Sequence, residues 1–274
     1  KAIFCAAALM FGAIGFAQDN SSTIDQEGND NDAFIQQVGE LNIADTDQTG
    51  DNNESTSTVD GDGNDVDIDQ IGDDNYALAN ALKSGNTFYA DNNTMVAYQN
   101  GDGNEVRMTD IGGDDNSLTS EQDGDDNFHR FSVRGNNNTL TSDVDGDENR
   151  GSWGISSGFP PSADWNNLEL VQDGFKNYST GEINGDYNEV KALQTGDNNR
   201  IGDSWYTSDG VVILGDYNKA HITQNGDGNQ AYSGQTGNWN ESYTVQTGMS
   251  HSSSVMQTGN GNVANATQSD VIVQ

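Results

Sequence analysis

The sequence predicts an all-β protein, a β-solenoid of about ten two-strand coils with two facing, parallel, in-register sheets and cross-β stacking. Three observations support this fold class: a polar motif that returns every eleven residues, apolar residues that alternate with polar ones inside each copy, and a glycine in 18 of 20 copies. Only 32% of residues are hydrophobic and the net charge is −34, which by itself would indicate disorder. A regular repeat overrides that indication, because an array can bury its faces by stacking on itself.

The repeat is visible in QVGELNIADTDQTGDNN, residues 37–53, where Gln-x-Gly-x-x-Asn occurs twice. With the asparagine as anchor, the chain has 20 anchors from Asn31 to Asn262, and 15 of the 19 intervals are eleven residues long. Asn86 and Asn104 are assigned as the anchors after Asn75, and His251 replaces asparagine once. The other intervals are 18, 12, 17 and 19 residues long, and the three long ones indicate loops inserted into an unbroken array.

Each unit is predicted to be one strand and one turn. The second and fourth residues after the anchor are small or apolar, as at Val66 and Ile68, and their neighbours are mostly polar. This alternation is typical of a half-buried strand. The glycine supplies the backbone freedom that a turn needs. Two units therefore form one coil of two facing strands.

The glutamine five residues before the anchor shows that odd and even units differ. From Gln48 to Gln224 this site alternates between glutamine and another residue, and Val144 is the only break. We therefore expect one sheet to carry a glutamine ladder and the other a Val/Ile column.

Stacked coils place equivalent residues about 4.8 Å apart. A buried amide is costly unless it is hydrogen-bonded, and a ladder satisfies each amide with its own copy one coil away. The predicted structural ladder consists of Gln26, Gly28, Asn31, Gln37, Gly39, Asn42, Gln48, Gly50, Asn53, Gln70, Gly72, Asn75, Gln172, Gly174, Asn177, Gln194, Gly196, Asn199, Gln224, Gly226, Asn229, Gln235, Gly237 and Asn240.

Aspartate follows the turn glycine in 12 of 20 units, so carboxylates would line both edges of the stack. Aspartate is a common turn residue and a solvating charge, which is one interpretation. The other is weak divalent-ion binding, which would let Ca²⁺ or lower pH speed assembly. The candidate metal ligands are Asp51, Asp62, Asp73, Asp186, Asp197, Asp216 and Asp227.

Catalytic signals are weak. GISSG at residues 154–158 matches the Gly-x-Ser-x-Gly elbow, but that motif needs a strand before it and a helix after it, and Ser156 precedes two prolines. The three histidines, His129, His221 and His251, are far apart in the sequence. We expect no catalytic residue, no cofactor and no enzyme activity. Trp153, Phe159, Trp165, Trp205 and Tyr206 lie in or beside the expected inserts, where they could pack locally or form a contact patch.

The charge argues against nucleic-acid and anionic-membrane partners, because both require basic proteins. Residues 1–17 look like a secretory signal peptide cleaved after Ala17. Residues 18–25 then form a lead segment, and 26–274 the repeat domain, with inserts near 87–98, 150–163 and 200–212. Cys5, the only cysteine, would be removed with the signal, and the mature chain has no apolar stretch long enough to span a membrane.

The units IDQEGNDNDAFIQQVGELNIADTDQTGDNN and AHITQNGDGNQAYSGQTGNWNESYTVQTG resemble curlin repeats, the building units of curli, the extracellular amyloid fibres of Gram-negative bacteria. The resemblance implies a self-assembling fibre subunit of the biofilm matrix that serves adhesion. It also implies secretion through an outer-membrane curli-type pore and a nucleator subunit at the cell surface. The alternatives are a non-polymerising secreted solenoid adhesin, a divalent-ion- or ice-binding surface protein and, more remotely, a polysaccharide-active enzyme.

Overall fold

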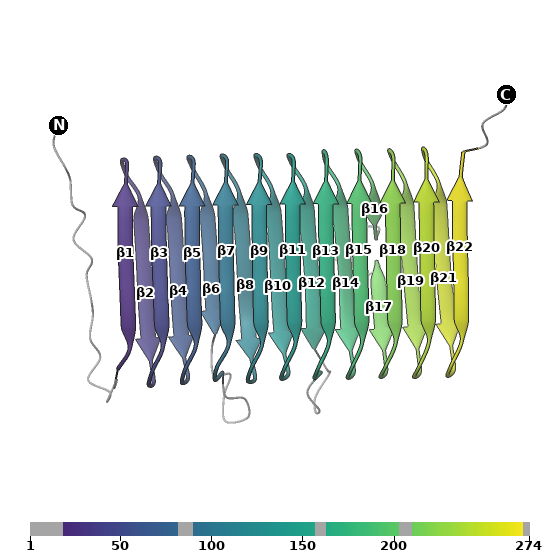
Figure 1. Ribbon diagram of the computed structural model, residues 1–274, viewed down its shortest axis with the longest axis horizontal. Coiled ribbons are helices and arrows are strands. Elements are labelled where there is room, and N and C mark those ends of the chain that lie inside the picture. The colour runs from purple at the N-terminus through teal and green to yellow at the C-terminus, as the bar shows by residue number, and fades with distance from the viewer. Residues whose placement is uncertain (1–18, 82–89, 157–162, 203–209, 271–274) are drawn as a thin grey trace.

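The computed structural model describes residues 19–81, 90–156, 163–202 and 210–270. All regular secondary structure in these residues is β-strand (Figure 1). Residues 1–17, expected to be a signal peptide, lie outside the described part. Within the described residues no helix is long and apolar enough to cross a membrane.

Twenty-two strands form two sheets, which we name sheet A and sheet B. Sheet A contains β1 (Ser21–Glu27), β3 (Ile43–Thr49), β5 (Asp65–Ile71), β7 (Thr94–Asn100), β9 (Ser117–Asp123), β11 (Thr139–Asp145), β13 (Asn167–Asp173), β15 (Glu189–Thr195), β18 (Lys219–Asn225), β20 (Glu241–Thr247) and β22 (Val263–Ser269). Sheet B contains β2 (Asp32–Val38), β4 (Glu54–Asp60), β6 (Tyr76–Ala81), β8 (Glu105–Gly112), β10 (Phe128–Arg134), β12 (Arg150–Ser156), β14 (Tyr178–Asn184), β16 (Arg200–Ile201), β17 (Val211–Leu214), β19 (Gln230–Thr236) and β21 (Ser252–Thr258).

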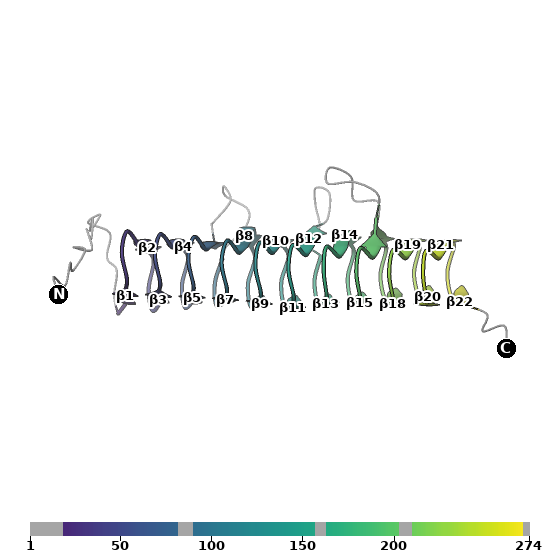
Figure 2. The same cartoon turned by 90° about the horizontal axis from the view of Figure 1, so that it is seen from above.

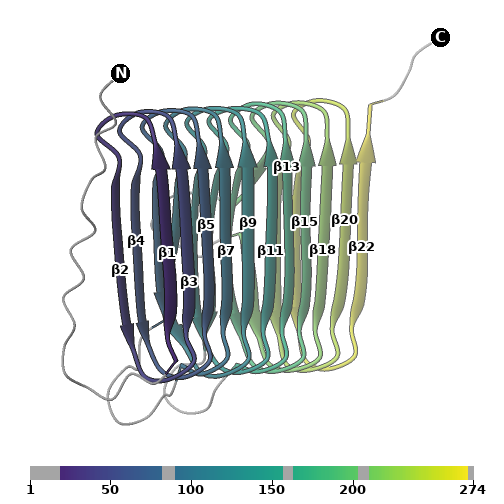
Figure 3. The ribbon, with the colours of Figure 1, turned by 60° about the vertical axis from the view of Figure 1, so that its left-hand side comes forward.

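The two sheets face each other along the whole stack, as Figures 2 and 3 show. The chain crosses from one sheet to the other at every turn, so each strand pairs in parallel with the strand one coil away. Ser21 thus lies opposite Ile43, and Ile43 opposite Asp65. The predicted all-β solenoid with two parallel, in-register sheets is confirmed.

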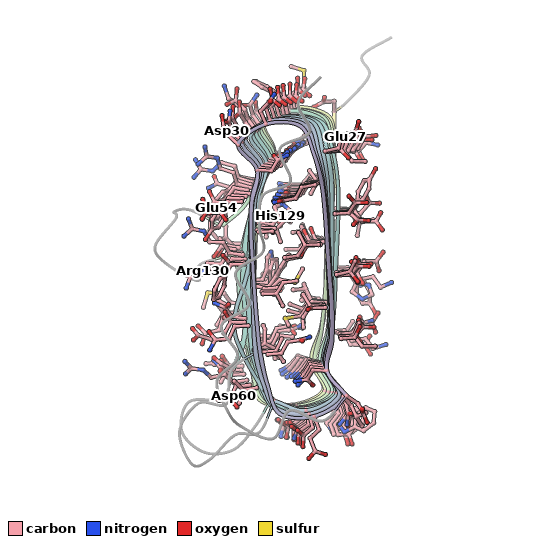
Figure 4. The ribbon with its side chains drawn as sticks, turned by 90° about the vertical axis from the view of Figure 1, so that its left-hand side faces the viewer. Glu27, Asp30, Glu54, Asp60, His129 and Arg130 are labelled. Atoms are coloured by element: carbon pink, nitrogen blue, oxygen red, sulfur yellow. The ribbon has the colours of Figure 1, made fainter. Side chains whose placement is uncertain are left out.

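Side chains alternate between the interior and the solvent, because successive residues of a strand point to opposite faces. Val66 and Ile68 are fully buried, whereas Asp65 and Asp67 are exposed and Asp69 is half-buried. Viewed along the stack, the interior side chains of both sheets fill a narrow space, and charged groups cover the outside (Figure 4). Each coil therefore buries apolar and amide side chains only because its neighbours cover it above and below.

Large and small interior residues compensate each other between adjacent coils. Trp153 is buried against Gly181, where an added Cβ would lie 2.1 Å from the indole Cζ3. The indole N–H donates to Ser179 Oγ at 2.8 Å. The column therefore accepts tryptophan only because glycine follows it.

The structure corrects the phase of the repeat around the first insert. The ladder continues from Asn64 to Asn93, whose backbone N–H and side-chain amide both donate to Asn64 Oδ1. Asn86 lies outside the described residues and is not the anchor that precedes β7. Strand β7 covers Thr94–Asn100, so the part of the expected insert from 94 to 98 belongs to the repeat instead.

Strands also occupy part of the second and third expected inserts. Residues 150–156 form strand β12, although 150–163 was expected to be a loop. In the third range, β16 and β17 together fill one strand position, since both pair with β19. The twelve-residue interval after Asn104 is absorbed by a bulge in β8, where Asp110 has φ 57° and the register with β6 and β10 shifts.

Candidate functional site: amide ladders and open sheet edges

A glutamine ladder runs through the interior side of sheet A. The Nε2 group of each glutamine donates to Oε1 of the glutamine one coil further on, at 2.6–3.1 Å. Its members are Gln26, Gln48, Gln70, Gln99 and Gln122, then Gln172, Gln194, Gln224, Gln246 and Gln268. The ladder therefore has a direction, with donors facing the C-terminal end.

Every glutamine of the ladder after Gln26 also ties the two sheets together, a contact that sequence reasoning missed. Gln70 Nε2 donates a second hydrogen bond to the backbone oxygen of Glu54 in sheet B, at 3.2 Å. Gln194 does the same with Tyr178, at 3.0 Å. Both protons of these buried amides are thus satisfied, and the distance between the sheets is fixed by hydrogen bonds as well as by packing.

Sheet B has a different column at the glutamine site. Val59, Ile111 and Ile213 are among its fully buried members. At this site of sheet B, glutamine occurs only near the ends of the described array, at Gln37, Gln235 and Gln257. Gln235 donates to Gln257 at 3.0 Å, whereas Gln37 lies opposite Val59 and donates to Ser21 O.

Asparagine ladders run along both edges where the strands begin. The backbone N–H and Nδ2 of Asn53 both donate to Asn31 Oδ1, and Nδ2 also donates to Gly72 O at 2.8 Å. The same backbone contact joins Asn42 to Asn64, Asn177 to Asn199 and Asn218 to Asn240. His251 takes an anchor position, and its backbone N–H donates to Asn229 Oδ1. The asparagine thus links three coils, which explains why it recurs.

The turn glycine is required by backbone conformation and by stacking. Gly50 has φ 124°, and a Cβ there would lie 2.0 Å from Gly72 O in the next coil. Any side chain at this position would be strained and would push the coils apart.

The turn aspartates make backbone contacts along the same edges. Oδ1 of Asp73 accepts the backbone N–H of Asp51 at 2.8 Å, and every candidate metal ligand accepts such a bond from the coil before it. The seven acceptors are Asp51, Asp62, Asp73, Asp186, Asp197, Asp216 and Asp227.

 Asp186, for example, accepts the N–H of Asp164 at 2.9 Å. Asn136 and Asn238 take the same role elsewhere in the column, so this contact does not require a charge.

Divalent-ion binding at these turns stays a prediction. Among the described residues no group of three or more His, Cys, Asp or Glu side chains is placed to hold a metal ion.

The only break in the sheet A ladder is repaired by a buried histidine. Val144 cannot donate to Gln172, and His129 from sheet B supplies the contact instead, with Nε2 2.9 Å from Gln172 Oε1. Because that oxygen only accepts, Nε2 carries the proton, and Nδ1 accepts from Ser142 Oγ at 2.5 Å. Burial lowers the pKa of His129 to about 4, so the ring is neutral at physiological pH.

The other residues considered from the sequence are dispersed. Ser156 ends strand β12 on the side of the sheet opposite to Ile155, and no helix follows it in the described residues. His221 pairs with Glu189 on the outside of sheet A, and His251 lies 3.2 Å from Asp270. The histidines therefore do not form a common site.

The two described members of the expected aromatic cluster, Trp153 and Trp165, lie in different environments. Trp153 is in the core, whereas Trp165 is exposed at an edge, and Phe159, Trp205 and Tyr206 lie outside the described residues. Trp165 begins a surface stack that sequence reasoning missed. Its ring stacks on Tyr187, followed by Tyr217 and Trp239, with centroids 6.2, 4.8 and 4.2 Å apart. Each of these aromatic residues comes directly before an anchor asparagine, so the repeat register would have been enough to find the stack.

Both ends of the described stack leave a strand edge open. Sheet A ends at β1 and β22, and sheet B at β2 and β21. In β20, the backbone N–H of Glu241 donates toward β22, to Asn262 O. Val263 is the register partner of Glu241, so its N–H and that of Asn265, two residues on, point away from β20. The β22 edge thus offers a row of backbone groups for a further strand.

Comparison with known proteins gives one match. The profile of the curlin associated repeat family matches residues 17–39 and 42–72. Two curlin associated repeats are therefore present in this chain. The two matched segments contain the first glutamine, glycine and asparagine ladder positions, including Gln26, Gly28 and Asn31. No curated protein and no solved structure matches the chain. The curlin repeat is thus matched at the N-terminal end, and the same hydrogen-bonded columns continue beyond it to β22.

Proposed function

We propose that the chain is a structural subunit of extracellular curli-like amyloid fibres, which joins other copies end to end in a biofilm matrix and serves adhesion and surface attachment. The observation that carries this proposal is the pair of open cross-β edges on a solenoid built of curlin repeats. An open edge is a template for a further strand of the same kind.

The direction of the ladders supports head-to-tail joining. Each Gln Nε2 donates toward the C-terminal end, so Gln268 presents a donor there and Gln26 presents an acceptor at the other end. The next copy can continue the ladder only in one polarity. Growth in this polarity keeps every new amide hydrogen-bonded.

The wider setting follows from the family. We propose that residues 1–17 are a secretory signal, that the fibre domain expected over 26–274 also includes β1 from Ser21, and that the chain leaves the cell through a curli-type outer-membrane pore. Assembly at the cell surface would begin on a nucleator subunit. The curlin repeats support this setting, because fibre subunits of this kind act outside the cell.

A proline in the outermost strand tests end-to-end joining. The substitution Asn265→Pro removes the backbone N–H of residue 265, which points away from β20. It removes no hydrogen bond between β22 and β20. Added in small amounts to growing wild-type fibres, this variant should join through β1 and then stop elongation. Asn265→Ala keeps the N–H and is the matched control.

The measurement is the elongation rate of preformed seeds with each variant. The proposal expects Asn265→Pro to suppress elongation at least about tenfold and Asn265→Ala to leave it near the wild-type value. If the proline variant elongates seeds as fast as the alanine variant, the β22 edge is not a growth end. Wild-type protein that stays monomeric would favour a non-polymerising solenoid adhesin.

A further inference from the structure

The arginines of the chain are confined to one face. All five arginines belong to strands of sheet B and are exposed: Arg107, Arg130, Arg134, Arg150 and Arg200. Sheet A has no arginine in a chain with a net charge of −34. Arg130 is seen on the outer face of sheet B in Figure 4. We name Arg107, Arg130 and Arg150 the arginine strip.

The strip keeps like charges side by side on neighbouring strands. Arg107 and Arg130 are register partners in β8 and β10. Aromatic rings support the strip, since the Arg107 guanidinium lies 5.4 Å from the Tyr76 ring centroid and 5.9 Å from that of Phe128. Arg107 already pairs through Nε with Glu105, and a guanidinium has further N–H donors that can face a second anion.

A complementary face lies on the opposite side of the molecule. Six aspartates cover the outside of β1, β3 and β5, and we name them the acidic grid: Asp25, Asp45, Asp47, Asp65, Asp67 and Asp69. Asp45 faces Asp67 and Asp47 faces Asp69 in register, and no ion pair among the described residues includes a member of the grid.

The grid is electrostatically unfavourable in an isolated molecule. Like charges directly opposite each other on adjacent strands destabilise a sheet. Partial burial, and then the charges of neighbouring aspartates, raise the pKa of Asp47, Asp67 and Asp69. A positively charged surface against the grid would relieve this repulsion.

We propose that the arginine strip of one copy docks on the acidic grid of a second copy. Both faces are the outsides of flat sheets, which pack about 10 Å apart. The grid is centred on β3 and the strip on β10, three to four coils further along, so docked copies would be staggered by roughly 15–20 Å at about 4.8 Å per coil. The contact uses different faces of the two copies, so it does not close and can join solenoids side by side.

This lateral contact goes beyond the proposed end-to-end assembly, because it uses sheet faces and leaves the strand edges open. The two contacts can therefore fail separately. Fibre elongation reports on the edges, and bundle width in electron micrographs reports on the faces.

Charge reversal on each face gives a paired test. One variant carries Arg107→Glu, Arg130→Glu and Arg150→Glu, and the other carries lysine in place of all six aspartates of the acidic grid. Each variant alone has two faces of like charge and should lose lateral bundling by at least tenfold in bundle number. A mixture of the two restores opposite charges at every contact and should bundle again. Lys191 and Lys219 show that sheet A accepts lysine on its outside.

A control separates repulsion from misfolding. Arg107→Gln, Arg130→Gln and Arg150→Gln together keep long polar side chains, and bundling of this variant should be weak at every salt concentration. Wild-type bundles should separate when the salt rises from about 0.02 M to 1 M, since the Debye length then falls to about 3 Å. Far-ultraviolet circular dichroism checks that each variant keeps its β-structure.

Three results would overturn the proposal. Bundling of either reversed variant at the wild-type level excludes this contact, and so does a mixture of two folded variants that fails to bundle. If the strip variant bundles normally but loses retention on alginate, the strip binds an anionic polysaccharide instead of a second copy.

Discussion

At the scale of single residues, the solenoid depends on side chains whose size and polarity are set by the coil next to them. Trp153 is accommodated because Gly181 follows it in the column, and the Gln172 carbonyl is satisfied because His129 lies across the break at Val144. Neither Trp153 nor His129 fits the repeat consensus. Each is explained by one neighbour 22 or more positions away in the chain.

Substituting Gly181 with alanine should lower the free energy of unfolding by about 1–3 kcal/mol, because the new methyl group would overlap the indole ring. Trp153→Leu in the same chain should recover part of this loss by opening space. The outward-facing Gly234→Ala is the control, since its Cβ would meet nothing nearer than Met256 Cγ at 3.8 Å. Denaturant unfolding measures all three, and equal effects of Gly181→Ala and Gly234→Ala would contradict the packing.

His129 should make the protein less stable as the pH falls from 6.5 to about 4. Its pKa is about 4 when folded and near 6.5 when unfolded, so the unfolded chain binds the extra proton first in this window. The stabilisation is complete above pH 6.5, and about 3 kcal/mol is lost by pH 4.

Denaturant unfolding between pH 5 and 6.5 measures this slope above the range in which most carboxylates titrate. The variant His129→Gln should flatten it, whereas His221→Gln, on the outside of sheet A, should not. An unchanged slope in His129→Gln would contradict a neutral, buried imidazole.

At the scale of strands and turns, the ladders make neighbouring coils depend on one another. Gln194 accepts from Gln172, donates to Gln224 and donates to Tyr178 O in the facing sheet. Removing it leaves a donor and acceptors unpaired in the interior and opens a cavity. A single substitution therefore affects three coils and both sheets.

Gln194→Ala should accordingly cost about 2–4 kcal/mol of unfolding free energy. Gln37→Ala is the matched control, because Gln37 is only half-buried and has Val59 instead of glutamine as its register partner. Thermal or denaturant unfolding compares the two variants. A Gln194→Ala loss no larger than that of Gln37→Ala would show that the ladder contributes little.

The sequence was sufficient to predict the strands and turns, because glycine, asparagine and the alternating apolar residues each depend on local geometry. It was insufficient to predict at which residue the repeat resumes after an insert. Asn86 lies eleven residues after Asn75 and satisfies the period, yet Asn93 begins the strand that contains Met95, Ala97 and Gln99. Local spacing cannot tell on which side of an insert the repeat resumes.

The stretch 150–156 was missed for a related reason. The interval from Asn149 to Asn166 is 17 residues long and contains two prolines, so an insert was expected near 150–163. The structure shows that Gly151 lies beside His129 and Leu170, and that Trp153 leans over Gly181. Such compensation between columns is visible only once the register is known.

At the scale of the whole molecule, the stack has no apolar core that could stand without its neighbours. Each coil is one layer of side chains closed by the coils above and below, and the end coils are closed on one side only. Val66 in an inner coil is fully buried, whereas Ala264, at the equivalent interior position of β22, is only half-buried. The end coils gain the same burial as the inner ones when a further copy joins them, which is the driving force for growth.

The central claim is that copies join into a continuous cross-β solenoid, and fibre X-ray diffraction of the purified chain, diluted from denaturant and incubated, tests it most directly. We expect a reflection at about 4.7–4.8 Å along the fibre axis and one near 10 Å across it. A folded, soluble monomer that yields no fibres, or fibres without the axial reflection near 4.8 Å, would contradict end-to-end assembly through the sheet edges.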